Sequence, residues 1–208
     1  MSTAEVEFRP LTSATWDSLA ALFAEGGDPM RCWCTFFRRK NASASGAAAA
    51  GNRDFLRGLA ARKDLAPGLV AFRDGRAVGW VSLAPREDYE RLEHSTVLAP
   101  VDDRPVWSIV CFVVSRTERG RGVAAALLDA AIDYAGNHGA TLLEAYPVDT
   151  EGRRIPAATA YRGTLGMFER AGFRVVTTRR ATSKTRPRPI VRREAHPPRR
   201  SPTKKSSS

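Results

Sequence analysis

The chain has 208 residues, of which 43% are hydrophobic, which is enough for one medium-sized domain with a substantial core. No apolar run approaches the roughly 20 residues of a membrane helix, and the N-terminus lacks the apolar segment of a secretory signal. We therefore expect neither a membrane protein nor a secreted one. Three cysteines, an odd number, fit a reduced cytoplasmic setting.

The net charge of +11 is concentrated near the C-terminus. Residues 181–208 hold nine Lys or Arg and one Glu, so they carry +8 of the total and leave +3 for residues 1–180. This segment is also rich in Pro and Ser, a composition that predicts a disordered basic tail behind one folded domain at 1–180. Such a tail can bind nucleic acid electrostatically, and a solubilising tail without a dedicated partner is the alternative.

The apolar pattern predicts alternating strands and helices. In chain order we expect a strand at 6–9, a helix after Thr12 or Ser13, a mobile stretch at 41–50, a helix at 52–62, a hairpin at 68–83, a strand at 107–114, a helix at 123–138, a strand at 141–146, a short helix ending at 171–172 and a strand at 173–178. The run at 107–114 is apolar throughout, as in a strand buried on both faces. The fold class we predict is α/β (α+β), a mixed sheet with helices on both faces.

The loop Arg119–Ala124 lies between a predicted buried strand and the start of a predicted helix. Free N–H groups and the helix dipole favour an anion there. Gly120 and Gly122 let the backbone approach a phosphate closely, and Arg119 and Arg121 add positive charge. A phosphate or pyrophosphate is the ligand that this pattern indicates. The alternative is an ordinary strand–helix connection whose arginines face water.

The same loop also satisfies the dinucleotide pattern GxGxxG/A, with Glu144 near the position of a ribose-binding acid. The long segment before Gly120, and the few elements left after it, count against a doubly wound nicotinamide-binding domain. A Walker phosphate loop is also disfavoured, because no Gly-Lys-Ser/Thr follows.

Two motifs at a suitable separation resemble the GNAT superfamily of N-acyltransferases. Arg119, Gly122 and Ala124 match Arg/Gln-x-x-Gly-x-Gly/Ala after a central strand, and residues 167–173, MFERAGF, look like Leu-Tyr-Glu-x-x-Gly-Phe. The predicted element order agrees over about residues 5–179. The resemblance implies a mostly antiparallel sheet whose central parallel pair is splayed.

The resemblance also implies a ligand and a reaction. Acetyl-CoA, or another acyl-CoA, is the implied co-substrate, and Arg119, Gly120, Arg121, Gly122, Val123 and Ala124 are the residues implied to hold its pyrophosphate. Pantetheine would pair with the backbone of Val113 and Val114, where a strand-end N–H polarises the thioester carbonyl. The acyl group would pass directly to a primary amine of a small molecule or a protein.

The general acid departs from the family pattern. Relatives often carry a Tyr in the last helix, where this chain has Phe168. Tyr161 stands seven residues earlier, where many relatives carry an Asn near CoA. Tyr161 therefore either contacts the cofactor, substitutes as the acid, or simply packs.

Glu144 is the candidate general base. A carboxylate in an apolar strand is costly to bury unless it is paired or used in catalysis. The alternative is a structural pair with Arg86 or Arg153. Together with Trp33, Arg86 and Tyr146 are the candidate residues for binding the acceptor.

The cysteines allow further hypotheses. The segment 31–34, RCWC, either shapes the acceptor cleft or packs in the core. A route through an acylated Cys111 is disfavoured, because no activating group lies near it in sequence. Cys32 and Cys34 with His94 imitate a zinc site, but the second pair of ligands is missing, so we expect no metal.

Several functions remain open at this level. Besides the transferase, the sequence permits an acyl-CoA-binding sensor without turnover, a nucleic-acid-associated protein acting through its basic tail, and a nicotinamide enzyme. The acceptor, the acyl chain and the oligomeric state are undetermined, a homodimer being one option.

Overall fold

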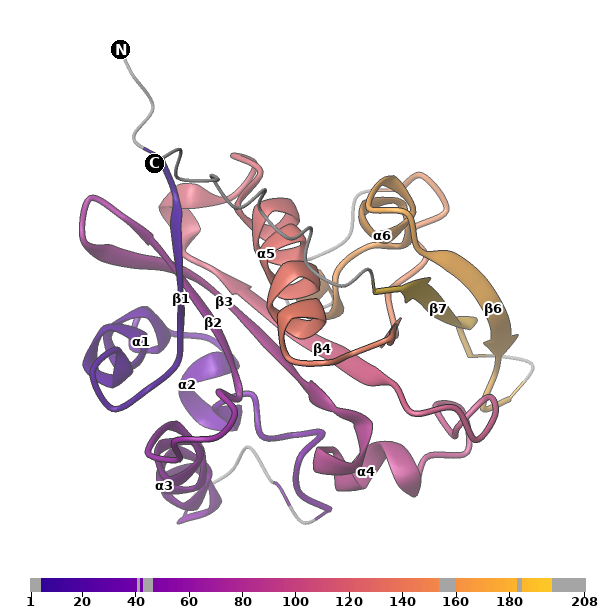
Figure 1. Ribbon diagram of the computed structural model, residues 1–208, viewed down its shortest axis with the longest axis horizontal. Helices are drawn as coiled ribbons and strands as arrows, with labels where there is room; N and C mark the ends of the chain where they lie inside the picture. The colour runs from indigo at the N-terminus through magenta and orange to yellow at the C-terminus, as the bar shows by residue number, and fades with distance from the viewer. Residues whose placement is uncertain (1–4, 41, 43–46, 154–159, 183–184, 196–208) are drawn as a thin grey trace, which may run out of the picture.

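A seven-stranded sheet forms the centre of the molecule, shown in Figure 1 by a computed structural model that describes residues 5–40, 42, 47–153, 160–182 and 185–195. Its order is β1-β2-β3-β4-β5-β7-β6. The strands are β1 Glu7–Pro10, β2 Gly68–Arg73, β3 Arg76–Pro85, β4 Trp107–Val114, β5 Leu142–Ala145, β6 Arg174–Arg179 and β7 Arg188–Glu194. Every neighbouring pair is antiparallel except β4 and β5, which confirms the predicted mixed sheet.

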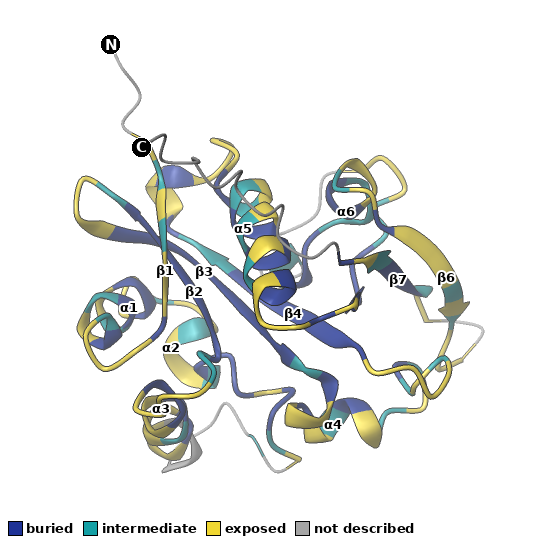
Figure 2. Ribbon diagram, in the orientation of Figure 1, coloured by how far each residue is buried: buried dark blue, intermediate teal, exposed yellow. Residues whose placement is uncertain are grey.

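Helices cover both faces of this sheet, as predicted. They are α1 Trp16–Phe23, α2 Pro29–Cys32, α3 Ala47–Ala60, α4 Glu90–Glu93, α5 Val123–Asn137 and α6 Leu165–Arg170, with short 3-10 turns η1 Arg86–Asp88, η2 Arg116–Glu118 and η3 Ala160–Arg162. The first three helices lie on one side of the sheet and α5 and α6 on the other (Figure 1). Figure 2 shows the buried strands between the two layers. Within the described ranges, no helix is both long and apolar enough to cross a membrane.

The start of α3 corrects one sequence expectation. The helix begins at Ala47, inside the stretch 41–50 that was expected to be mobile. Alanine is the best helix former, so a run of alanines extends the helix before the expected start at Asn52. Residues 41 and 43–46 of that stretch lie outside the described part of the chain.

A β-bulge bends β4 at its middle. Cys111 and Ile109 pair with consecutive residues of β3, so Val110 is the extra residue on β4. The side chains of Val110 and Cys111 consequently pack on the same face, in the apolar cluster beneath α1 and α3. Ile109 and Phe112 pack on the opposite face, beneath α5.

The parallel strands β4 and β5 separate at this bulge. They are paired only from Trp107 to Ile109 on the β4 side, and residues 110–114 have no partner on β5. This is the splayed central pair that the sequence resemblance implies. It leaves one backbone edge of β4 available next to the loop that follows the strand.

The domain boundary at residue 180 is wrong in part. Residues 188–194, assigned to a disordered tail, form β7, which pairs with both β5 and β6. Ile190 and Val191 are fully buried. This short apolar pair is not recognisable as a strand from composition, because basic residues and prolines surround it. The folded domain therefore extends to about Glu194, and residues 196–208 lie outside the described part of the chain.

Truncation tests this revised boundary. A chain ending at residue 187 lacks β7 and should lose cooperative thermal unfolding, because β5 and β6 both lose their partner strand. A chain ending at residue 195 keeps β7 and should melt like the full chain. Circular dichroism melts of the two truncations check this, and a normal melt for the shorter chain would contradict the assignment.

Candidate functional site

The loop between β4 and α5 has the backbone of an anion-binding turn. Gly120 and Gly122 have φ angles of +77° and +81°, a left-handed conformation that other residues adopt only at a cost. Gly122 is the N-cap of α5 and offers no side chain to cap it. A Cβ atom at either glycine would meet nothing within 4 Å, so open space lies in front of both.

Positive charge surrounds this uncapped helix end. The first N–H groups of the 15-residue α5 point out of the helix without intrahelical acceptors. Arg119 and Arg121 are exposed beside them, and Arg121 Nη1 lies 3.7 Å from Glu118 Oε1. Glu118 is itself buried and held by Arg73. The loop is thus anchored from behind and keeps its cationic side chains toward solvent.

Close packing behind the loop fixes the start of α5. A Cβ atom at Gly79 on β3 would lie 2.8 Å from Leu127 Cδ1 and 2.9 Å from Val123 Cγ1. Only a glycine therefore lets the first turns of α5 approach the sheet so closely. Since the Val123 side chain is buried in this contact, only its backbone can face a ligand, and Ala124 next to it is half-buried.

The expected pantetheine residues lie on the free edge of β4. Val113 and Val114 are half-buried, and their side chains pack into opposite apolar clusters. The backbone edge between them faces the gap left by β5. Arg119 Nε lies 3.4 Å from the carbonyl oxygen of Val114, which links the strand end to the loop.

Tyr161 lies beside the same stretch of β4. It belongs to η3, which contacts β4, and it packs against the apolar cluster that contains Cys111. Burial, followed by the nearby Cys111, raises the pKa of Tyr161 to about 12. The hydroxyl is therefore protonated at neutral pH and able to act as a donor.

Phe168 occupies the helix position where relatives often have a tyrosine. Its ring is fully buried and packs edge-on against Phe112 and Phe173, with ring centroids 6.1 and 5.1 Å away. The Phe168 side chain therefore packs in the core and cannot act as the general acid.

The predicted base, Glu144, lies in a buried charge cluster. Its side chain is fully inaccessible, and its Oε1 accepts from Arg86 Nη1 at 2.8 Å and from the Tyr146 hydroxyl at 2.6 Å. Its Oε2 accepts from Arg192 Nε at 2.7 Å. The pairing with Arg86 that the sequence left as an alternative is observed, whereas the pairing with Arg153 is not, because Arg153 lies 3.6 Å from Glu151.

Arg86, a predicted acceptor-binding residue, has all of its hydrogen-bond donors in use. A guanidinium has five N–H groups. Nε donates to Glu93, Nη1 to Glu144 and Tyr146, and Nη2 to the carbonyl oxygens of Leu92 and Leu98. An acceptor molecule would have to displace one of these partners to bind Arg86.

Tyr146, the third acceptor candidate, closes the same cluster. It is buried, and its hydroxyl lies 2.9 Å from Ser108 Oγ. Burial, with the Glu144 carboxylate as the next cause, raises the pKa of Tyr146 well above its ordinary value. The hydroxyl thus stays protonated and donates to Glu144 instead of facing solvent.

Sequence reasoning missed Arg192 and Asp102. Arg192 lies on β7 and bridges Glu144 to Asp102, with its Nη1 2.7 Å from Asp102 Oδ2. This guanidinium holds the pKa of the Asp102 carboxyl below its usual range. The available signal is the apolar pair Ile190 and Val191, which the surrounding Pro and Arg residues outweigh in composition.

Trp33 is buried in the core. Its ring stacks on Trp16 with centroids 5.5 Å apart, and its φ of +47° is left-handed. Cys34 follows with φ +51°, so two consecutive residues adopt a conformation that costs roughly 1–2 kcal/mol each. The sequence left two interpretations of segment 31–34, a wall of the acceptor cleft or packing in the core. Trp33 packs in the core.

The cysteines meet at the bulge of β4. Cys34 Sγ and Cys111 Sγ are 3.1 Å apart, and burial raises the pKa of the Cys34 thiol well above its ordinary value. Both are free thiols in a buried setting, which gives no activated nucleophile at Cys34. Among the described residues, no group of three or more His, Cys, Asp or Glu could hold a metal ion.

The nicotinamide alternative does not fit this arrangement. A dinucleotide domain needs a parallel, doubly wound sheet, whereas five of the six strand pairs in the described sheet are antiparallel and β4–β5 is parallel. Glu144 is enclosed by two arginines and cannot reach a ribose at the loop.

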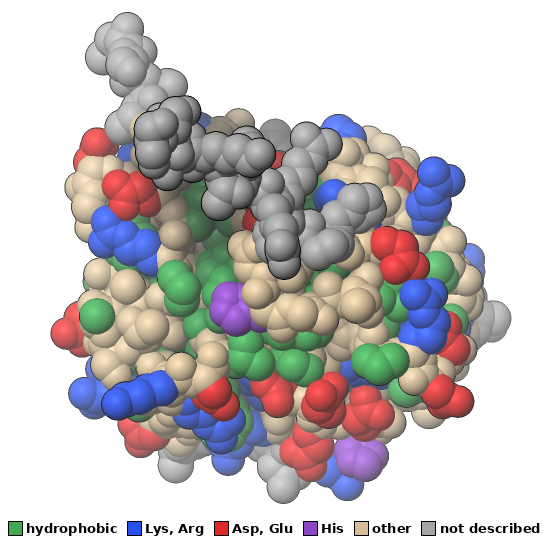
Figure 3. Space-filling model, in the orientation of Figure 1, with side chains coloured by type: hydrophobic (Ala, Val, Ile, Leu, Met, Phe, Trp, Pro, Cys, Tyr) green, Lys and Arg blue, Asp and Glu red, His purple; other side chains and the backbone are tan. Residues whose placement is uncertain are grey.

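Three of the basic residues that the sequence assigns to the tail, Arg188, Arg192 and Arg193, belong to β7. Arg192 is engaged inside the fold, and Arg193 Nη1 donates to the carbonyl oxygen of Ala171 at 2.7 Å. On the face shown in Figure 3, basic and acidic side chains are interspersed around the rim and form no continuous basic surface.

Comparison with known proteins gives a consistent result. The model of the Acetyltransferase (GNAT) family matches residues 29–173. A search of curated proteins found no match. Solved structures with the same fold include a GCN5-related N-acetyltransferase from Kribbella flavida, with 20% identity, TM-score 0.54 and coverage of 91% of this chain and 97% of that one.

Two further structures are similar at comparable levels. One is described as histone acetyltransferase HPA2 and related acetyltransferase from Corynebacterium glutamicum, with 18% identity, TM-score 0.56 and coverage of 93% and 97%. The other is NAA60 from Arabidopsis thaliana in complex with acetyl-CoA, with 14% identity, TM-score 0.50 and coverage of 91% and 99%. At these identities the likeness shows the fold.

The tyrosines give a testable alkaline signature. All four, Tyr89, Tyr134, Tyr146 and Tyr161, have pKa values raised by burial, to about 12 for Tyr89 and Tyr161. A raised folded pKa contributes stability below the unfolded value near 10, and that stability is lost as pH rises toward 12. Tyrosinate absorbance should therefore stay low at pH 10 and appear together with unfolding. Titration of more than one tyrosine near pH 10 in the folded protein would contradict the burial of Tyr89, Tyr146 and Tyr161.

Proposed function

Since the chain belongs to the GNAT acetyltransferase family, we propose that it transfers an acetyl group from acetyl-CoA directly to a primary amine. One observation carries the proposal: an uncapped helix with left-handed glycines at its start lies beside the free backbone edge of β4. A pyrophosphate suits the first, and an extended amide chain suits the second. Acetyl-CoA contains both, and it supplies the acetyl thioester.

The cofactor would be bound both by backbone groups and by charged side chains. The N–H groups at Gly122, Val123 and Ala124 would bind phosphate oxygens at the positive end of α5. Arg119 and Arg121, both exposed, would add charge from the sides. Val113 and Val114 would offer their backbone to the pantetheine amides, because no strand of the described part of the chain pairs with that edge.

Tyr161 is the proposed acid. It lies against β4, it is half-buried, and its raised pKa keeps the proton on its oxygen at neutral pH. A hydroxyl there can donate to the sulfur of the departing thiolate. This assignment replaces the tyrosine that many relatives carry at the position of Phe168.

For Glu144 we propose a positioning role in place of the role of base. A carboxylate that accepts from two guanidinium groups and a hydroxyl, with no exposure to solvent, is closed to an incoming amine. What it does instead is tie β5 to Arg86 and to Arg192 of β7, one residue before the last β4–β5 pair, Ile109 and Ala145. The separation of the strands then begins at a fixed place.

A sensor that binds acyl-CoA without turnover is the second candidate. The observation in its favour is Phe168, whose ring fills the core at the position of the family's usual acid. It shares the cofactor site with the transferase and differs only in lacking acetyl transfer to any amine.

Substitution of Gly122 tests the cofactor site. Gly122→Asp places a carboxylate at the open N-terminus of α5 and should weaken acetyl-CoA binding at least about tenfold, because it repels phosphate. Calorimetry measures this. Gly75→Asp is the control, because Gly75 has a similar φ of +74° and open space around it, but lies in the β2–β3 hairpin. Equal acetyl-CoA affinity of both variants and the wild type would show that the cofactor does not bind at this loop.

Substitution of Glu144 separates positioning from catalysis. Glu144→Gln removes the one buried carboxylate that Arg86 and Arg192 share, leaving them only their partly exposed partners Glu93 and Asp102, and should lower the free energy of unfolding by about 3 kcal/mol, with acetyl-CoA binding retained. The control is Glu151→Gln, where an exposed pair is lost. Chemical denaturation and a pH–rate profile are the measurements. Wild-type stability together with a large loss of rate and of the acidic, low-pH limb of the profile would restore Glu144 as the base.

A further inference from the structure

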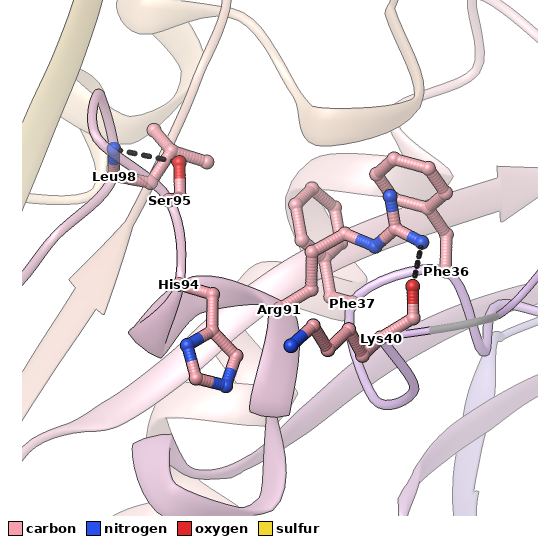
Figure 4. A pocket seen from close by; sticks show the side chains of 7 residues that line it. All are labelled: Phe36, Phe37, Lys40, Arg91, His94, Ser95 and Leu98. Carbon is pink, nitrogen blue, oxygen red and sulfur yellow. Dashed lines mark hydrogen bonds between the residues drawn. The ribbon is translucent and has the colours of Figure 1, made fainter.

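A second concave site lies between two segments that have no role in the cofactor site. It has a volume of about 360 Å³ and is shown in Figure 4. Residues 36–40 form one wall, and residues 91–98, which include the end of α4, form the other. Its lining residues are Phe36, Phe37, Lys40, Arg91, His94, Ser95 and Leu98. This volume is in the range of sites that bind small molecules.

The lining combines basic and aromatic side chains. Lys40, Arg91, His94 and Ser95 contribute the polar part, and no acid is among the described residues that line the site. The Arg91 guanidinium lies over the Phe36 ring, 4.1 Å from its centroid, and its Nη2 donates to the carbonyl oxygen of Lys40 at 2.6 Å. Stacking and this hydrogen bond hold the guanidinium in place, so a fixed positive charge faces an apolar floor.

Arg91 and Lys40 both retain capacity to bind. Arg91 Nη2 donates to the carbonyl oxygens of Lys40 and Ala42, and its Nη1 has no hydrogen-bond partner within the described residues. The Lys40 side chain is exposed and forms no ion pair in that part of the chain. In Figure 4 it extends from its own segment toward the side of the site where His94 lies.

The nearby acids are engaged elsewhere. Glu90 Oε2 accepts from the backbone N–H of Lys40 at 3.0 Å, and Glu93 Oε1 accepts from Arg86 Nε at 2.9 Å. Both belong to α4 and lie outside the lining of the site. The charge that faces the cavity is therefore basic, which favours an anionic ligand.

One guanidinium separates this site from the place where β4 and β5 part. The carbonyl oxygen of Leu98, a lining residue, accepts from Arg86 Nη2 at 2.8 Å. Nη1 of the same guanidinium donates to the Tyr146 hydroxyl at 2.5 Å, and Tyr146 is the first residue after β5. Phe37 and Leu98 also belong to the apolar cluster that contains Cys111 at the bulge.

We propose that this cavity binds the carboxylate of the acceptor, so that the substrate is a small amine that carries a carboxylate at its other end. Lys40, Arg91 and His94 hold the carboxylate, and Phe36 and Phe37 contact the apolar chain or ring between the two groups. The proposal rests on the proposed acetyl transfer and specifies its substrate class.

Matched pairs of amines test this class. Each pair consists of a carboxylate-bearing amine and the same amine without the carboxylate: γ-aminobutyrate and propylamine, ε-aminocaproate and pentylamine, p-(aminomethyl)benzoate and benzylamine. With acetyl-CoA saturating, we expect kcat/KM to be at least about tenfold higher for one or more of the acids than for its neutral partner. Equal values in all three pairs, or higher values for the neutral amines, would overturn the proposal.

Lys40 variants assign the preference to this cavity. Lys40→Gln should raise KM for the preferred acid about tenfold and leave KM for its neutral partner unchanged. Lys40→Glu should raise KM for the acid further. Arg76→Gln is the control, because Arg76 is exposed and lies on the β2–β3 hairpin in another surface hollow. An equal effect of Lys40→Gln on both members of a pair would overturn the assignment.

Binding of benzoate separates this proposal from the proposed function. Calorimetry should detect benzoate binding to the wild type and to Arg76→Gln, with at least a fivefold loss in Lys40→Gln. Acetylation of neutral amines without benzoate binding would overturn the cavity's role and leave the transferase intact. Benzoate binding without acetylation of any amine would overturn the transferase, and with it the acceptor role, and leave an anion site.

Discussion

Two guanidinium groups enclose the carboxylate of Glu144, one residue before the pairing of β4 with β5 ends. A carboxylate that is removed from water needs such partners, and here they come from distant parts of the chain. Arg86 belongs to the connection after β3 and Arg192 to β7. The cluster therefore requires that the β3–β4 connection and the C-terminal strand both be folded before the centre of the sheet is complete.

The separation of β4 from β5 follows from this arrangement. Before the bulge at Val110, residues 107–109 of β4 pair with β5. After it, residues 110–114 have no partner on β5. Backbone N–H and C=O groups inside a protein rarely stay without partners. An extended ligand with amide groups is the kind of molecule that such an edge accommodates, and the anion-binding loop that follows the strand sets the direction in which it lies.

The sequence predicted the elements that depend on local signals and missed those that depend on distant partners. Glycine spacing in the loop and the apolar run of β4 are local, and both are where the sequence placed them. β7 was missed because only Ile190 and Val191 are apolar between arginines, and its role depends on a buried carboxylate 48 residues away in sequence from Arg192. Arg86 was assigned to the acceptor because its backbone acceptors, Leu92 and Leu98, cannot be inferred from residue type.

The two faces of the sheet have different chemistry, and the gap in the sheet joins them. On the α5 side, helix geometry and arginines favour phosphate. On the other side, the bulge turns both Val110 and Cys111 toward the layer that also contains Phe37 and Leu98. A donor held from one face and an acceptor held from the other would meet where the strands part. Arg86 donates hydrogen bonds to both Leu98 and Tyr146. A shift of Leu98 at the cavity would therefore alter the position of Tyr146 beside β4, and a shift of Tyr146 would alter the cavity.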